Sequence, residues 1–177
     1  DAGIPVAMIA PWSADVALPP GVTALGWDSN VSNSMGIGLL RKLGHERISV
    51  ILSETGPMAS GRYQGLDRTF SEQGAHIDEA LVVWMGDDPD DVGEIQGALN
   101  SATAIFAPPS TLHLLASECY AKNLRWPDNI SIITIGHSES IPQLGSNPFT
   151  YVGVPVGRIS RSAAHILSSL IEQEETS

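Results

Sequence analysis

The sequence contains a single cysteine, Cys119, among its 177 residues. One thiol cannot form an internal disulfide and cannot supply the thiolates of a cysteine-based zinc site. Cys119 lies in an apolar pattern of helical spacing, so we expect a buried thiol that does not react.

Basic residues are also scarce. Nine Lys and Arg stand against twenty Asp and Glu, which gives a formal net charge of −11. Proteins that hold nucleic acid cluster Lys and Arg to neutralise phosphates, whereas the nine basic residues here are scattered. The composition therefore argues against direct DNA binding by these residues.

Long apolar runs are lacking as well. No run approaches the ~18 residues of a membrane-spanning helix, and the opening residues do not resemble a signal peptide. We expect a cytoplasmic protein without a membrane partner. The chain opens directly on a strand-like pattern at 3–9, so we also expect it to be part of a longer protein.

Motifs of catalysis and of metal binding are missing. The five histidines show no i, i+4 pair of a zinc helix, and Gly-x-Ser-x-Gly does not occur. The glycines at 36 and 38 lie inside a helical pattern, not directly after a strand as in a nucleotide site. The acidic run at 87–91 lacks the glycine and distal glutamate of a calcium loop and is better explained as a solvated loop. We predict no enzyme, no cofactor and no metal.

Strand-like and helix-like segments alternate along the chain. Apolar or β-branched runs occur at 6–9, 22–25, 48–52, 81–84, 104–107, 130–135 and 151–154. Helical spacing is found at 30–43, 59–72, 92–99, 111–123 and 159–171. This alternation predicts an α/β fold, with a mainly parallel, doubly wound sheet and helices on both faces.

The first of these helices carries local signals for its start and its inner face. Asn30 or Ser32 can cap its first turn. Met35, Leu39 and Leu40 recur at helical spacing, so we expect them on the face that is turned to the core.

Two junctions are more specific than the alternation. Residues 43–51 read Leu-Gly-His-Glu-Arg-Ile-Ser-Val-Ile, where Gly44 can close a helix just before a strand suited to burial. Residues 126–133 read Trp-Pro-Asp-Asn-Ile-Ser-Ile-Ile, again a proline break followed by a β-branched run. Together they resemble the sugar-binding-protein-like core of bacterial transcription repressors of the lac-repressor (LacI/GalR) family.

Five further segments carry the same resemblance in order. They are Ile-Pro-Val at 4–6, Ala-Leu-Gly-Trp-Asp-Ser-Asn at 24–30, Gly-Arg-Tyr-Gln-Gly-Leu at 61–66, Thr-Ala-Ile-Phe-Ala at 103–107 and Asn-Pro-Phe-Thr-Tyr-Val at 147–152. The resemblance implies a periplasmic-binding-protein-like fold of type I, with a complete C-terminal subdomain and a partial N-terminal one.

The resemblance also implies a division of the chain. Residues 1–28 would be a remnant of the N-terminal subdomain, and residues 29–152 the C-terminal, effector-binding subdomain. Residues 153–177 would form a crossover and a helix that returns to the N-terminal subdomain.

In the family a small-molecule effector, such as a sugar or a nucleoside, lies between the two subdomains. Asp28 occupies the place of the acidic residue after the family's Val-Asp-Asn strand, and Arg62 that of the helix-start arginine. The family's Ala-Asn-Asp loop is here Pro-Pro-Ser, ending at Ser110, and its Asp-Asp strand end is Gly-His, ending at His137. The aromatic residue that often stacks on the effector falls on Asp88.

Each candidate ligand residue has a structural alternative. An arginine fork suits a carboxylate or a vicinal diol, but Asp28 and Arg62 can instead pair with each other or with backbone and hold a hinge. Ser110 can cap the helix 111–123 or offer its hydroxyl to a ligand. His137 can contact a ligand or face solvent in its loop.

Two tryptophans complete the candidate site. Trp27 lies beside Asp28, and Trp84 ends an apolar strand. Either ring can stack on a ligand or bury itself in a core, and core packing is the more common role for a tryptophan in the position of Trp84.

The predicted function is that of the effector-sensing and dimerisation domain of a LacI-type regulator. Operator DNA would be bound only through an N-terminal head outside these residues. The expected homodimer uses the helix 111–123, whose His113, Leu114 and Tyr120 lie off the face turned to the sheet. A periplasmic-type solute-binding protein of the same fold is the alternative. In the full gene, an upstream helix-turn-helix would indicate the regulator and a signal peptide would indicate transport.

Overall fold

The computed structural model describes residues 6–12, 21–53, 59–86, 91–143 and 148–175. The elements are, in order, β1 (Val6–Trp12), β2 (Val22–Asp28), α1 (Ser29–Lys42), β3 (Ile48–Ser53), α2 (Ala59–Glu72), η1 (Glu79–Leu81), β4 (Val82–Met85), α3 (Asp91–Ser101), β5 (Ala104–Ala107), η2 (Pro109–Thr111), α4 (Leu112–Ala121), β6 (Ser131–Gly136), η3 (Ser138–Ser140), β7 (Thr150–Gly153) and α5 (Val156–Glu175).

The chain forms two compact units. Unit 1 comprises Asp1–Ser29 and Val154–Ser177, and unit 2 comprises Asn30–Gly153. These bounds lie one residue from the division expected from the sequence, and the subdomain roles attached to that division remain predictions.

Unit 2 is built on a five-stranded sheet in the order β4-β3-β5-β6-β7. Every neighbouring pair is parallel, with Val50 opposite Phe106 and Ile105 opposite Ile132 as examples of the register. Parallel neighbours need a crossover connection between them, and α2, α3 and α4 supply three of these connections, while the segment that contains η3 joins β6 to β7. The predicted fold class, a mainly parallel doubly wound sheet, is confirmed.

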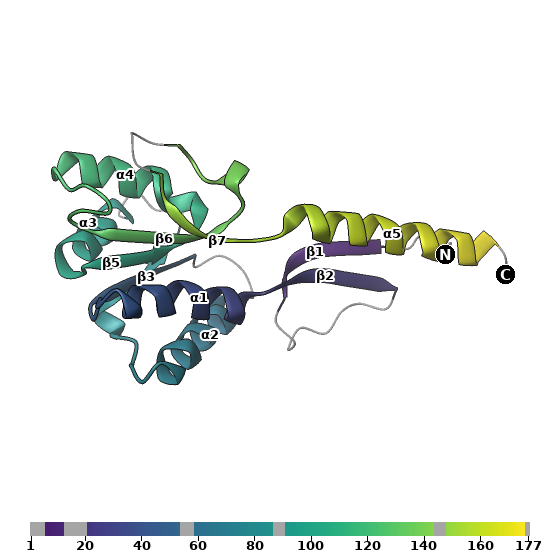
Figure 1. Ribbon diagram of the computed structural model, residues 1–177, viewed down its shortest axis with the longest axis horizontal. Coiled ribbons are helices and arrows are strands. Elements are labelled where there is room, and N and C mark those ends of the chain that lie inside the picture. Colours follow the sequence, from purple (N-terminus) through teal and green to yellow (C-terminus); the bar gives the residue numbers. More distant parts are fainter. Residues whose placement is uncertain (1–5, 13–20, 54–58, 87–90, 144–147, 176–177) are drawn as a thin grey trace. The chain divides into compact units, whose positions relative to one another are not determined.

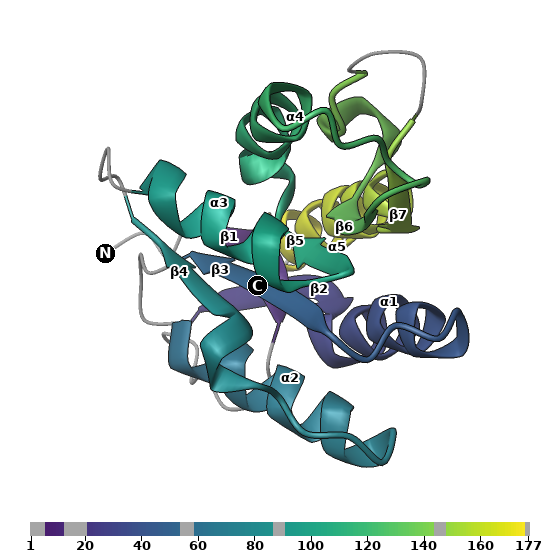
Figure 2. The ribbon, with the colours of Figure 1, turned by 90° about the vertical axis from the view of Figure 1, so that its left-hand side faces the viewer.

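The two faces of this sheet carry separate cores. Helices α1 and α2 cover one face, and α3 and α4 cover the other (Figures 1 and 2). Strand β5 contributes to both, because Ala104 and Phe106 pack toward α1 and α2 while Ile105 and Ala107 pack toward α3 and α4. Burial on both faces explains why this strand is apolar throughout.

The helix starts differ from the sequence prediction at two places. Helix α1 begins before Asn30 and Ser32, so neither residue is its cap. Ser110 lies exposed inside η2, and α4 starts after it without a side-chain cap. The Thr111 hydroxyl donates instead to the Pro108 carbonyl oxygen at 2.9 Å. The prediction that Ser110 caps α4 is therefore wrong, because a 3₁₀ turn enters the helix.

The inner face of α1 was also predicted wrongly in part. Leu40 is fully buried, but Met35 is 61% exposed and Leu39 40% exposed. The helix approaches the sheet through Gly36, where a Cβ atom would lie 2.5 Å from the Phe106 ring. The bulky Phe106 ring on β5 leaves room only for a glycine at this point of α1. The side of α1 that carries Gly36 therefore faces the sheet.

Unit 1 contains the parallel pair β1 and β2, paired from Val6 with Val22 to Trp12 with Asp28. Helix α5 packs against both strands (Figure 1) and buries Ile159 and Ala163. Although α5 has 20 residues, no helix within the described ranges is both long and apolar enough to cross a membrane.

Candidate functional site

Four of the six predicted site residues lie at or after the carboxyl ends of the strands in unit 2. Arg62 lies in the first turn of α2, which follows β3, and Trp84 is the third residue of β4. Ser110 follows β5, and His137 follows β6 directly. The carboxyl ends of parallel strands meet at one edge of the sheet, where ligands bind in open α/β folds. The fold therefore brings these four residues to one edge.

Arg62 contributes an exposed charge at this edge. Its side chain is exposed and, within the part of the chain that the structure describes, makes no hydrogen bond or ion pair. It extends from the amino end of α2, where the helix dipole adds positive potential. This guanidinium can bind a carboxylate or a diol without first losing a protein partner.

Trp84 has an aromatic partner that the sequence analysis missed. Its ring stacks on Tyr63 with centroids 6.1 Å apart and planes 28° apart, and both rings are half-buried beside the core under α1 and α2. Partial burial raises the pKa of Tyr63 above 10.0, with smaller contributions from the carboxylates of Glu79 and Asp67. The phenol therefore stays protonated at neutral pH and can donate a hydrogen bond.

The segments after β5 and β6 meet at Gly136. A Cβ atom there would lie 2.9 Å from Ser140 Oγ and 3.3 Å from Pro109 Cγ. Ser140 Oγ donates to the His137 carbonyl oxygen at 2.9 Å and accepts from its amide at 3.2 Å, which fixes the backbone of His137. Ser110 is exposed at the same corner. Ser110 and His137 thus stand where the resemblance places acids, and the exposed Glu139 follows His137 in η3.

Trp27 and Asp28 belong to unit 1, at the end of β2. Trp27 is half-buried and lines an open groove of about 500 Å³, together with residues of α5. Asp28 is exposed, and because side chains alternate along a strand it points to the other face from Trp27. The groove also contains Arg158, which the sequence analysis did not single out.

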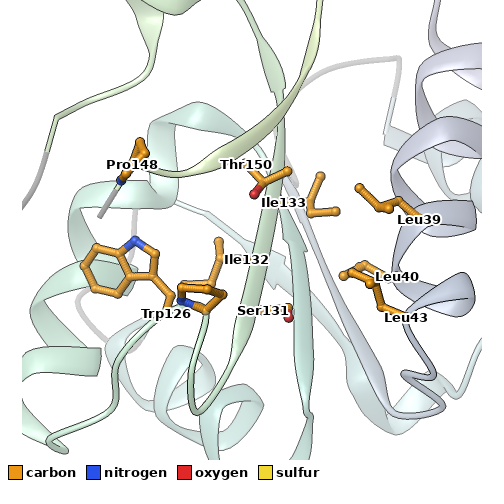
Figure 3. A pocket seen from close by; sticks show the side chains of 10 residues that line it. Leu39, Leu40, Leu43, Trp126, Ser131, Ile132, Ile133, Pro148 and Thr150 are labelled. Atoms are coloured by element: carbon orange, nitrogen blue, oxygen red, sulfur yellow. The ribbon is translucent and has the colours of Figure 1, made fainter. Parts of the chain in front are cut away.

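A second, smaller cavity lies at the other end of the sheet (Figure 3). It measures about 110 Å³ and is bordered by the first residues of β6 and β7 and by the last turns of α1. Trp126 borders it and stacks on Phe149, with centroids 4.9 Å apart. The lining is Leu39, Leu40, Leu43, Trp126, Pro127, Ser131, Ile132, Ile133, Pro148 and Thr150. The polar side-chain groups of this lining are two hydroxyls and the Trp126 indole nitrogen, so the cavity is mostly apolar, and it is separate from the carboxyl edge.

Metal ligands do not gather in the part of the chain that the structure describes: no three His, Cys, Asp or Glu residues there could hold one ion. Residues 87–90 of the acidic run, Asp88 included, lie outside the described residues.

Comparison with known proteins places the chain in a family. Residues 37–177 match the periplasmic binding protein-like domain family. No curated protein sequence matches the chain.

Solved structures with the same fold include three LacI-family regulators. The one from a Rhodococcus species is 19% identical, with a TM-score of 0.76 over 95% of this chain and 62% of its own. The one from Chloroflexus aggregans is 16% identical, with a TM-score of 0.75 over 95% and 61%. The one from Mycobacterium smegmatis is 22% identical, with a TM-score of 0.69 over 88% and 60%.

The chain thus spans about three fifths of the length of these regulators. At these identities the likeness concerns the fold, and the family match over 37–177 covers most of the sequence. The chain therefore belongs to the periplasmic binding protein-like domain family, with the fold found in LacI-family transcriptional regulators.

Proposed function

We propose that this chain is the effector-sensing part of a LacI-type transcriptional regulator. The observation that carries the proposal is the carboxyl edge of unit 2, where Arg62, which has no side-chain partner among the described residues, lies at the same edge as Trp84, Ser110 and His137. The three solved structures reported above, each named as a regulator of the LacI family, support the regulator over a solute-binding protein.

The ligand would be a small molecule bound at the carboxyl edge of unit 2. Arg62 would bind its carboxylate or diol, and Trp84, backed by Tyr63, would offer an apolar wall. Ser110 and His137 would donate or accept single hydrogen bonds. Trp27 and Asp28, which end β2 in unit 1, are further candidate ligand residues.

The proposed mechanism is a population shift. The chain crosses between the two units at 29–30 and at 153–154, so these short crossings can act as hinges. A ligand that binds one arrangement of the units more tightly increases the population of that arrangement. The size of the shift is set by the difference between the ligand's affinities for the two arrangements. In a homodimer such a change would alter the spacing of DNA-binding heads carried outside these residues.

DNA binding would belong to those heads. This chain has a net charge of −11, so it cannot displace the cations that surround the phosphates of DNA. A cytoplasmic homodimer is part of the same proposal.

The test uses the intact gene product. It is incubated with fragments of its own genome, and the retained fragments are sequenced to identify an operator. Sugars, nucleosides and small carboxylic acids are then added singly. Release of the operator fragment by one compound, with unrelated DNA unaffected, supports the proposal. A gene product that begins with a signal peptide and retains no DNA, but binds a solute, would identify a solute-binding protein instead.

A further inference from the structure

Unit 1 contains a groove whose chemistry points to one class of ligand. The groove lies between β2 and the first turns of α5, and its volume of about 500 Å³ falls within the ~300–1,000 Å³ of small-molecule sites. Its lining is Leu25, Gly26, Trp27, Pro155, Arg158, Ile159 and Ser162.

One positive charge stands in this groove without an opposite charge. Arg158 is exposed and, among the described residues, makes no side-chain hydrogen bond or ion pair. None of the lining residues is acidic. Arg158 is the third residue of α5, so the positive end of a 20-residue helix adds to its attraction for an anion.

A hydroxyl lies one helical turn from the guanidinium. Ser162 follows Arg158 at i+4, which places both residues on the same side of α5, and both line the groove. A carboxylate held by the arginine fork can accept a further hydrogen bond from this hydroxyl.

The rest of the lining is mostly apolar. Leu25 and Trp27 alternate onto the same face of β2, and both line the groove with Pro155 and Ile159. The Trp27 ring is half-buried, so a planar group that stacks on it would bury apolar surface of both partners.

We infer that this groove binds a small organic anion, namely a carboxylate carried on a flat apolar body. A neutral sugar would leave the guanidinium without a counter-charge, and inorganic phosphate would leave the Trp27 wall uncovered. The binding of an anion in this groove does not depend on the proposed function. Only the identification of this anion as the effector rests on it.

The test is calorimetric titration of the full 177-residue chain with sodium benzoate, with benzamide as the neutral molecule of the same shape. Loss of the charge removes the ion pair with Arg158, so we expect benzamide to bind at least about tenfold more weakly. Acetate, which has the charge without the ring, should also bind more weakly than benzoate.

Two matched substitutions locate the binding. Arg158→Gln should weaken benzoate binding by about tenfold or more, and Arg158→Lys should recover part of that loss. Arg161→Gln changes the same charge on the same exposed helix face but does not line the groove, so benzoate affinity should stay within about twofold. Unchanged circular dichroism would exclude unfolding as the cause.

Three results would overturn the inference: equal affinity for benzoate and benzamide, equal effects of the Arg158 and Arg161 substitutions, or no benzoate binding at about 20 mM. Its failure is distinct from failure of the proposed function, because the titration contains no DNA. If aromatic carboxylates bind through Arg158 but none releases the operator, the groove is an anion-binding site but not the effector site.

Discussion

Arg62 offers the clearest residue-scale test of the carboxyl edge. Its guanidinium is exposed and makes no hydrogen bond or ion pair with the described residues, so its removal should cost little folding free energy, within about 0.5 kcal/mol. A ligand that depends on its bidentate fork should lose about 1.5–3 kcal/mol of binding free energy in Arg62→Ala. Binding is measured by calorimetry with the effector from the operator-release screen.

The matched control is Arg68→Ala, which removes an exposed arginine further along α2. It should leave effector affinity unchanged. If Arg62→Ala binds the effector normally and instead unfolds at lower urea, the arginine is structural.

Cys119 gives a residue-scale prediction with a pH dependence. The thiol is fully buried, and burial, followed by the charge of Glu118, raises its pKa from 9.0 to about 11. Only the thiolate reacts, so the native protein should resist a disulfide reagent at pH 8 and react fully in denaturant. Rapid labelling of the native protein would contradict this burial.

The same shift affects stability at high pH. Because the unfolded thiol ionises near 9.0 while the folded thiol stays protonated to about 11, ionisation favours the unfolded state. Stability should therefore fall as pH rises through this window. Cys119→Ala should lack this component when urea unfolding is compared at pH 8 and pH 11.

At the scale of elements, the approach of α1 to the sheet depends on one glycine. A Cβ atom at Gly36 would lie 2.5 Å from the Phe106 ring, so Gly36→Ala should reduce the free energy of unfolding by about 1–3 kcal/mol. That loss would outweigh the gain of up to ~1 kcal/mol in helix propensity. Urea unfolding measures it.

The control is Gly97→Ala in α3, where a Cβ atom would meet nothing within 4 Å. This variant should be more stable by about 0.5–1 kcal/mol. If both variants are equally stable, α1 does not approach β5 as closely as described.

The order of elements could be predicted from the sequence, and the helix faces could not. The junction at 43–51 predicted a helix end and a strand, and Gly44 indeed has a φ of +90° between them. Local spacing also suggested that Met35 and Leu39 are buried, although they form part of an exposed stripe. The exposed fractions along this stripe are 56% for Val31, 61% for Met35, 40% for Leu39 and 63% for Leu43. Which side of α1 turns inward is set by Phe106, a tertiary contact that no local pattern contains.

Site residues divide in the same way. Arg62 could be predicted because a helix-start arginine belongs to a local motif. Tyr63 and Arg158 could not. Tyr63 stacks on Trp84 and Arg158 lines the same groove as Trp27, and both tryptophans are remote from them in sequence. His45 is another contact that the sequence could not predict. Its ring nitrogens form hydrogen bonds with Thr103 Oγ1 and Ser131 Oγ, both at 2.9 Å, and the three residues lie at or just before the starts of β3, β5 and β6.

At the scale of the whole molecule, the proposed homodimer makes a prediction about α4. Leu114 was expected off the sheet-facing side, but it is half-buried and packs against the core. Tyr120 is 86% exposed and is the large side chain that α4 leaves for a partner. Tyr120→Glu should make the protein monomeric in sedimentation velocity, because a charge at a two-fold contact faces its own copy.

The control places the same substitution elsewhere. Tyr151→Glu changes an exposed tyrosine on β7 (43% exposed) and should leave the dimer intact. Dimers that survive Tyr120→Glu but dissociate in Tyr151→Glu would move the interface to β7.

The central claim is that a small molecule bound by this chain changes the arrangement of its two units. The most direct measurement is the distance between spin labels on exposed positions, Ser168→Cys in unit 1 and Glu94→Cys in unit 2. The buried Cys119 should remain unlabelled. We predict that saturating effector shifts the distance distribution toward one population, and that Arg62→Ala prevents the shift at the same effector concentration. An unchanged distribution in the presence of bound effector would contradict the claim that this chain is a sensor.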